Sequence, residues 1–261
     1  MKLKELAEKL SLSQTTVSRA LNGYPEVNEA TRERVNRAAL KFGYSANANA
    51  RRLAMGRVGA IGIIVPAESS QRFGPHTAEF LAGLAERLAR DEIDFLISPL
   101  VDNDEISVYR RLISSKRVDA IIVSHPSLVD ERVSMLIDAK FPFVLHGRTN
   151  VSRPHAWLDI DNQGAFHQAA SHLLDLGHRH IAMIDGLRGF TFSEHRELGY
   201  RQALGERGIE VDPRFIVHDR FSDEIGFRET QRLLACRPHP TAIIAGSMMT
   251  ALGVSRAVRN N

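Results

Sequence analysis

The sequence contains little cysteine and no long apolar run. Cys236 is the only cysteine among 261 residues, so no disulfide can form within the chain, and we expect it to be an ordinary helix residue in a reducing compartment. No apolar run reaches the ~18 residues that a membrane-spanning helix needs, and the first ten residues lack the apolar core of a secretory signal. These absences predict a cytoplasmic protein without a membrane partner.

The motifs of common enzyme and metal sites are also missing. The sequence has no G-x-x-x-x-G-K-[ST] phosphate loop, no G-x-G-x-x-G after a strand-like run, and no closely spaced set of Cys and His residues. An enzyme is therefore disfavoured. We expect no catalytic residue, no metal and no other cofactor.

Charge is distributed unevenly along the chain. Residues 1–57 carry 11 Lys and Arg against 5 Asp and Glu, a formal charge of +6, whereas the remaining residues carry 23 against 26, a formal −3. A basic head on a mildly acidic body predicts that the head binds a polyanion.

The first 46 residues show the spacing of three short helices, expected near 3–10, 14–22 and 28–42. Ser13 and Asn28 are suited to cap the second and third helices, and Gly23 is suited to end the second. Two short helices joined by a tight turn and braced by a third form a helix-turn-helix unit. The spacing alone is also that of a small helical bundle with a polar surface.

The stretches LKELAEKLSLSQTTVSRALNG and EVNEATRERVNRAALKFGYSANANARRLA resemble the headpiece of the LacI/GalR family of bacterial transcriptional repressors. The resemblance implies that the second helix enters the major groove of double-stranded DNA, where Gln14, Thr15 and Arg19 read base edges. It also implies contacts to the DNA backbone from five further polar residues, which are Ser13, Thr16, Ser18, Asn22 and Asn28.

The same resemblance implies a hinge helix within residues 47–57. In the family this helix folds when two copies meet in the minor groove at the centre of the operator. Leu53 would then wedge into a base step and kink the DNA, and Ala50 would let the two helices approach closely. These features imply a homodimer on a near-palindromic operator.

From residue 58 onward, apolar strand-like runs alternate with amphipathic helices. Continuous apolar strands are buried on both faces, as in a parallel doubly wound sheet. A break at 157–162 divides the pattern, which predicts one α/β lobe at 58–158 and a second at 159–261. Two such lobes facing each other form a cleft that can close on a small molecule.

LDIDNQGAF, LLDLGHRHIAMIDG and HRELGYRQAL resemble the family's periplasmic-binding-protein-like sensor domain. The resemblance implies that Arg196 binds the effector, since a guanidinium offers several fixed donors to sugar hydroxyls or to an anion. It also puts Phe221 at a position where an aromatic ring stacks on the effector. Six further candidates lie at strand ends or at the start of the next helix, namely Glu68, Ser69, His76, Ser124, His125 and His146.

Two features depart from the family pattern. Gly246-Ser247 stands where the family usually has Asn-Asp, which removes a charged partner for sugar hydroxyls and leaves Ser247 as a candidate contact. Family members also continue beyond Asn261, so we expect a C-terminally truncated chain with an incomplete second lobe.

The predicted function is sequence-specific transcriptional repression controlled by a saccharide, with an α-glucoside as the first candidate. Effector binding would close the cleft, disorder the hinges and release the operator. Two alternatives stay open: a sugar-binding module with little DNA activity because truncation impairs dimerisation, and an activator with the same fold.

Overall fold

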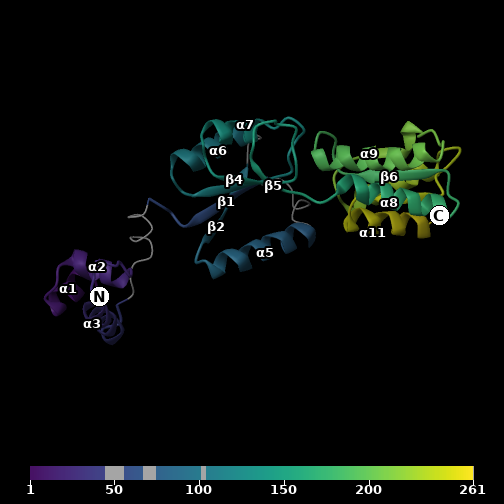
Figure 1. Cartoon of the computed structure of the whole chain (residues 1–261). Helices are drawn as coiled ribbons and strands as arrows, with labels where there is room; N and C mark the ends of the chain where they lie inside the picture. Colours follow the sequence, from purple (N-terminus) through teal and green to yellow (C-terminus); the bar gives the residue numbers. More distant parts are fainter. Residues whose placement is uncertain (45–55, 67–74, 101–103, 261) are drawn as a thin grey trace. The chain divides into compact units, whose positions relative to one another are not determined.

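The computed structural model describes residues 1–44, 56–66, 75–100 and 104–260. It divides into two compact units, Met1–Val58 and Gly59–Asn261, which are described separately (Figure 1). Four sequence-predicted positions lie outside the described residues, namely Ala50, Leu53, Glu68 and Ser69, and so does the side chain of His76. None of the described helices has both the length and the apolar character that crossing a bilayer requires.

The first unit contains the three predicted helices, α1 (Leu3–Leu10), α2 (Gln14–Leu21) and α3 (Glu29–Lys41). Both predicted caps are present, because Ser13 accepts a hydrogen bond from the Thr16 amide and Asn28 accepts one from the Thr31 amide. The helices enclose a small apolar core in which Leu6, Val17 and Val35 are fully buried.

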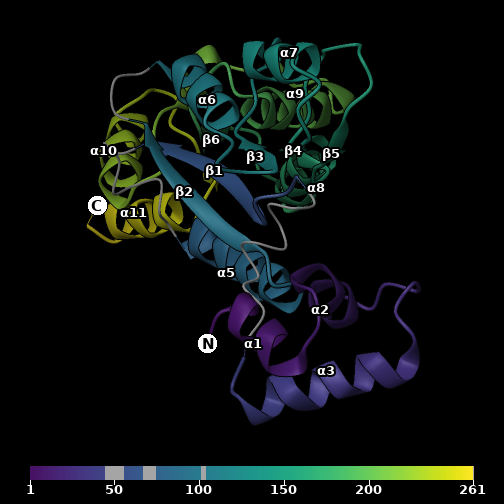
Figure 2. The same ribbon diagram turned by 90° about the vertical axis from the view of Figure 1, so that its left-hand side faces the viewer.

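The N-terminal lobe of the second unit is a parallel sheet with the strand order β2-β1-β3-β4-β5. Its strands are β1 (Ala60–Pro66), β2 (Asp94–Leu100), β3 (Ala120–Ser124), β4 (Phe143–His146) and β5 (Ala156–Leu158). Its helices are α5 (Pro75–Arg90), α6 (Glu105–Ser114) and α7 (Glu131–Asp138). Helices α6 and α7 cover one face and α5 lies on the other (Figures 1 and 2). The short strand β5 overlaps the start of the break that the sequence indicated at 157–162.

The C-terminal lobe is a parallel sheet with the strand order β7-β6-β8. Its strands are β6 (Ile181–Asp185), β7 (Ile216–His218) and β8 (Ala242–Ala245), with a 3-10 turn, η2 (Pro213–Phe215), before β7. Its helices are α8 (Asn162–Asp175), α9 (Thr191–Glu206), α10 (Asp223–Leu234) and α11 (Met248–Arg259).

Strand β6 is buried along its whole length, as its continuous apolar sequence predicts. Ile181 and Met183 pack into one cluster with residues of α8 and α9, whereas Ala182 and Ile184 pack into another with residues of α10 and α11. Successive side chains of a strand point to opposite faces, so the two helix pairs cover the two faces of the sheet. This layering places the carboxyl end of β6, at Asp185, between them.

Each helix pair of this lobe packs closely at glycines. A Cβ atom on Gly199 of α9 would lie 2.0 Å from the carbonyl oxygen of Gln163 in α8. On the other face, a Cβ on Gly226 of α10 would lie 2.2 Å from the carbonyl oxygen of Thr250 in α11. Backbone therefore meets backbone at both contacts, and only glycine fits there.

Candidate functional site

Helix α2 presents the three predicted base-reading side chains to solvent. Gln14, Thr15 and Arg19 are exposed, while Val17 and Ala20 of the same helix are buried in the headpiece core. Within the described residues, no hydrogen bond or ion pair engages the side chains of Gln14, Thr15 and Arg19. This face of α2 therefore offers donors and acceptors of the kinds that base edges pair with.

The five predicted backbone-contacting residues lie at the ends of α2 and α3 or in α2 itself. Besides capping α2, the Ser13 hydroxyl lies 2.8 Å from the Thr16 hydroxyl. Asn22 donates its side-chain amide to the Ser18 carbonyl oxygen at 2.8 Å. These bonds hold the helix ends, where free backbone amides favour anions such as phosphate.

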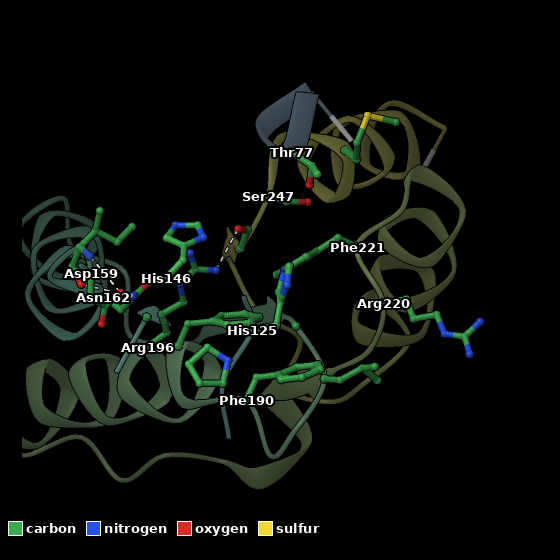
Figure 3. A pocket seen from close by; sticks show the side chains of 18 of the residues that line it. Thr77, His125, His146, Asp159, Asn162, Phe190, Arg196, Arg220, Phe221 and Ser247 are labelled. Carbon is green, nitrogen blue, oxygen red and sulfur yellow. Dashed lines mark hydrogen bonds between the residues drawn. The ribbon is translucent and has the colours of Figure 1, made fainter. Parts of the chain in front are cut away.

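A cavity of about 550 Å³ in the second unit is lined by residues from both lobes (Figure 3). Two predicted residues of the N-terminal lobe line it, His125 and His146, and three of the C-terminal lobe do, Arg196, Phe221 and Ser247. Ser124 is not among the lining residues, and its buried hydroxyl has no hydrogen-bond partner in the described part of the chain. Within the described residues, no group of three or more His, Cys, Asp or Glu is placed to hold a metal ion.

Arg196, on the second turn of α9, is held on two sides. Its Nε donates to Asn162 Oδ1 at 2.8 Å, and its Nη1 donates to Asp185 Oδ1 at 2.9 Å and to the carbonyl oxygen of Gly246 at 3.2 Å. The guanidinium also lies 5.0 Å from the centre of the Phe192 ring. These contacts fix the plane of the guanidinium, and no hydrogen bond from the described residues engages Nη2, which is therefore available to a ligand.

Asp185, the last residue of β6, is the buried partner of Arg196. Its side chain is fully buried, and its Oδ2 atom accepts no hydrogen bond in the described structure. Burial raises the pKa of the Asp185 carboxyl above its ordinary value, although the nearby Arg196 charge opposes this shift. The site therefore contains a carboxylate that the protein keeps at an energetic cost, a feature of functional sites.

Aromatic side chains form one wall of the cavity. The Phe190 and Phe192 rings stack with centroids 5.7 Å apart, and Phe221 lies 6.0 Å from Phe192. His125, from the other lobe, meets the Phe190 ring edge-on at 5.9 Å, and Figure 3 shows the labelled rings grouped in this region. His146 stacks on Phe80 of α5 at 4.3 Å.

The sequence reasoning missed several lining residues: Asn162, Phe190, Phe192, Arg148, Asp159 and Asp219. Three of them could have been predicted from the sequence. Asp159 and Asn162 belong to the LDIDNQGAF stretch that carries the family resemblance, and Asp219 directly follows a strand.

Ser247, which lines the cavity, also caps α11 by accepting a hydrogen bond from the Thr250 amide at 3.1 Å. The Nδ1 atom of His178 lies 2.9 Å from the Thr241 hydroxyl.

A loop at the end of β3 joins the two lobes at the cavity. The backbone amide and the hydroxyl of Thr191 both donate to the carbonyl oxygen of Pro126, at 2.9 and 3.1 Å. Ser127 forms an isolated antiparallel bridge with Phe190. The start of α9, which carries Arg196, is therefore tied to the loop that carries His125.

Arg132 of α7 fixes the conformation of this loop through hydrogen bonds to Asp130 and to the backbone of His125. It donates to both carboxylate oxygens of Asp130, at 3.0 and 2.7 Å, and to the carbonyl oxygen of His125 at 3.1 Å. His125 has φ 52°, a left-handed conformation that residues other than glycine rarely adopt. Burial opposes ionisation of Asp130, yet the hydrogen bonds and charge of Arg132 outweigh it and lower the pKa of that carboxyl.

Arg132→Ala is expected to destabilise the second unit by about 3–5 kcal/mol, because it leaves Asp130 buried without its ionic partner. The measurement is thermal and denaturant unfolding. Arg90→Ala is the control, since its ion pair with Glu86 is exposed and should contribute only about 0–1 kcal/mol. Equal losses in the two variants would contradict the structural role of Arg132.

The pair also predicts a dependence on pH. Because the folded-state pKa of Asp130 is lowered, its contribution to stability is present above the ordinary Asp pKa of about 4 and is lost as the pH falls through the folded-state value. Arg132→Ala should therefore lose less stability than the wild type over this acidic range.

A helix-turn-helix unit followed by a two-lobed α/β unit with a cavity between its lobes defines a ligand-responsive DNA-binding protein. Residues 2–47 match the family described as bacterial regulatory proteins, lacI family, and residues 58–261 match the periplasmic binding proteins and sugar binding domain of the LacI family. The chain belongs to the LacI family of DNA-binding transcriptional regulators, which are not enzymes.

Relatives and solved structures agree with this assignment. The chain is 44% identical to the HTH-type transcriptional regulator AglR of Rhizobium meliloti (strain 1021), over 98% of this chain and 72% of AglR. It is 34% identical to the regulator RafR of Escherichia coli, over 99% of this chain and 76% of RafR. The structure of the transcriptional regulator CelR in complex with cellobiose has a TM-score of 0.69 at 28% identity, covering 100% of this chain and 78% of CelR. The lac repressor dimer bound to its operator has a TM-score of 0.80 at 22% identity, over 100% and 78%, and shares the fold.

Proposed function

We propose that the chain represses transcription as a homodimer on a near-palindromic operator and that a saccharide in the cavity releases it. The observation that carries this proposal is the cavity itself, which is lined by His125 and His146 from one lobe and by Arg196 and Phe221 from the other. A ligand that contacts both lobes binds their two arrangements unequally, and this difference is what shifts a conformational equilibrium.

The proposal divides the chain into a headpiece at 1–46, a hinge at 47–57 and lobes at 58–158 and 159–261. In the headpiece, Gln14, Thr15 and Arg19 are proposed to read bases, because they are exposed on α2 while that helix is anchored by buried Val17. Ser13 and Asn28, which cap α2 and α3, are proposed to contact phosphates at the ends of these helices.

Arg19→Ala is expected to weaken operator binding by about 1–3 kcal/mol and to relax the base preference at one position of each half-site. The loss follows from removing a side chain suited to pair with guanine in the major groove. Binding to an operator library randomised at each position, at fixed salt, measures both quantities.

Arg37→Ala provides the matched control for that experiment. Arg37 is exposed on α3 and lies 3.8 Å from Glu33, so its loss removes the same charge from the headpiece without touching α2. It should weaken binding to all sequences alike. If Arg19→Ala leaves every base preference intact, Arg19 does not read bases.

The choice of a saccharide is supported by the chemistry of the cavity. Aromatic rings such as Phe192 and Phe221 suit the apolar face of a sugar ring, and the fixed donors of Arg196 suit its hydroxyl groups. Among the similar proteins, CelR is known in complex with cellobiose. The residues proposed to contact the effector are those that line the cavity, and Ser124 is not among them.

The test is release of an operator fragment by a panel of saccharides, followed by fluorescence anisotropy, with thermal shift of the free protein as a second readout. A saccharide that both stabilises the protein and lowers its operator affinity is the expected result. If no saccharide changes either quantity, the effector is of another class and this part of the proposal fails.

A further inference from the structure

The charged side chains that line the cavity are balanced in number. Within the described residues three are basic and three are acidic, namely Arg148, Arg196, Arg220, Glu79, Asp159 and Asp219. The buried carboxyl of Asp185 lies beside Arg196 and adds a fourth acidic group. The described surroundings of a ligand thus hold more acidic than basic side chains.

The two arginines with positions fixed at the cavity are each neutralised by a carboxylate. Arg196 Nη1 lies 2.9 Å from Asp185 Oδ1, and Arg148 Nε lies 2.9 Å from Asp159 Oδ2. The carboxylates are the more buried partners, with 0% and 9% of their side chains exposed. An anion reaching either guanidinium would therefore lie close to a carboxylate that water screens poorly.

The third arginine, Arg220, lines the cavity beside Asp219. Figure 3 shows its guanidinium extending away from the other labelled residues. The neighbouring Asp219 carboxylate is engaged by Arg228 at 2.7 Å and by the Arg220 backbone amide. Glu79, on α5, is exposed and adds negative charge to the rim.

Gly246 is what allows the Asp185 carboxylate to occupy this place. A Cβ on residue 246 would lie 1.9 Å from Asp185 Oδ1 and 3.0 Å from the Phe221 ring. Any larger residue at 246 would therefore displace either the carboxylate or the aromatic wall. The sequence suggested that Gly246-Ser247 removes a charged group from the site. In the structure, Gly246 makes room for a different carboxylate, that of Asp185 at the end of β6.

One oxygen of the Asp185 carboxylate has no hydrogen-bond donor placed on it among the described residues. Its Oδ2 atom is buried and accepts no hydrogen bond within the described residues, whereas Oδ1 binds Arg196. A buried acceptor without a donor is costly, and a ligand hydroxyl or a water molecule would relieve that cost. A phosphate or a second carboxylate offers no such donor when ionised.

The size and the rings of the cavity suit a molecule larger than one sugar ring. A volume of about 550 Å³ lies in the range of sites that enclose a drug-sized ligand, and it leaves room for a disaccharide. Lining rings come from both lobes, with Phe190, Phe192 and Phe221 on one and His146, which stacks on Phe80, on the other.

We propose that the cavity takes an uncharged saccharide of about two rings and that Asp185 is a specificity-determining residue that excludes phosphorylated and carboxylated sugars. The proposal rests on the proposed function, since it concerns the same cavity. Asp185 acts by neutralising Arg196, and its Oδ2 atom accepts from a ligand hydroxyl at a place where an ionised phosphate or carboxylate would be repelled.

The test compares matched pairs of probes at pH 8, where imidazole groups are ordinarily neutral. The pairs are maltose and maltose 6′-phosphate, sucrose and sucrose 6-phosphate, and trehalose and trehalose 6-phosphate, and affinity is measured by calorimetry on the full chain. The neutral member of a pair should bind about 100-fold or more tightly than its phosphate, because like charges in a poorly screened site repel strongly. A phosphate that binds as well as its neutral partner overturns the proposal while the proposed function stands. Failure of every saccharide overturns both.

Asp185→Asn tests the role of the residue itself. The amide keeps the size of the side chain but releases the positive charge of Arg196, so the ratio of phosphate to neutral affinity should rise by about tenfold or more. Asp175→Asn is the control, because Asp175 is exposed at the far end of α8 and pairs with Arg207. Its ratio should equal that of the wild type.

If Asp185→Asn does not fold, a second variant can still test whether paired carboxylates exclude anionic ligands. Asp159→Asn removes the partner of Arg148 in the same way and should raise the same ratio. An unchanged ratio in every folded variant would show that paired carboxylates do not set the charge preference.

Discussion

Gly253→Ala, in α11, is expected to cause one of the largest losses of stability available from a single methyl group in this chain. A Cβ at 253 would lie 2.0 Å from the carbonyl oxygen of Asp223 and 2.6 Å from the backbone nitrogen of Phe227. Both atoms belong to the backbone of α10, so no side-chain rotation can relieve the overlap. Helix α11 would have to move off α10, which is already in backbone contact with it at Gly226.

Overpacking a core typically costs about 1–3 kcal/mol and occasionally more, and we expect at least about 3 kcal/mol here because backbone must shift. For a unit of this size, each kcal/mol lowers the melting temperature by about 2–4 °C. Circular dichroism melting of the full chain measures the loss.

Gly205→Ala is the matched control for Gly253→Ala. Gly205 also lies in a helix of the C-terminal lobe, α9, but no neighbouring heavy atom would approach its Cβ within 4 Å. Replacing it should be neutral or stabilising by about 0.5–1 kcal/mol, the ordinary gain of Ala over Gly in a helix. If the two variants melt at the same temperature, the close approach of α10 and α11 does not limit packing.

Close helix contacts at glycines are poorly predicted from sequence patterns. The order of strands and helices followed from the alternation of apolar runs with amphipathic segments, because buried parallel strands are apolar throughout. A glycine within a helical pattern, such as Gly199 or Gly226, signals only weak helix propensity. Which helices touch at that glycine depends on the tertiary packing of segments far apart in the chain.

In the candidate site, too, some residues could be predicted from local sequence patterns and others depend on tertiary contacts. Arg196 and Phe221 came from a resemblance between short stretches, and both line the cavity. Asp185 ends the apolar run HIAMID, where a carboxylate is as easily exposed as buried. Its importance arises from contact with Arg196 and with Gly246, 61 residues away, and no local pattern encodes that contact.

Arg196→Lys is expected to abolish the response to the effector while leaving operator binding intact. Lysine retains one positive charge near Asp185, so the buried carboxylate keeps a counter-charge and the lobe remains folded. It cannot reproduce the planar set of donors by which Arg196 binds Asn162, Asp185 and the carbonyl oxygen of Gly246 together. The donor that should face the ligand is then no longer held in place.

Losing a fixed, mostly buried charged donor costs about 2–5 kcal/mol of binding, which is about 30-fold to several thousand-fold in affinity. The measurement combines calorimetry with the effector and anisotropy with the operator, at one salt concentration. Arg207→Ala is the control, because Arg207 caps the other end of α9 and its ion pair with Asp175 is exposed. An effector response that survives Arg196→Lys unchanged would remove Arg196 from the binding site, whereas a response lost equally in Arg207→Ala would trace the effect to helix α9 as a whole.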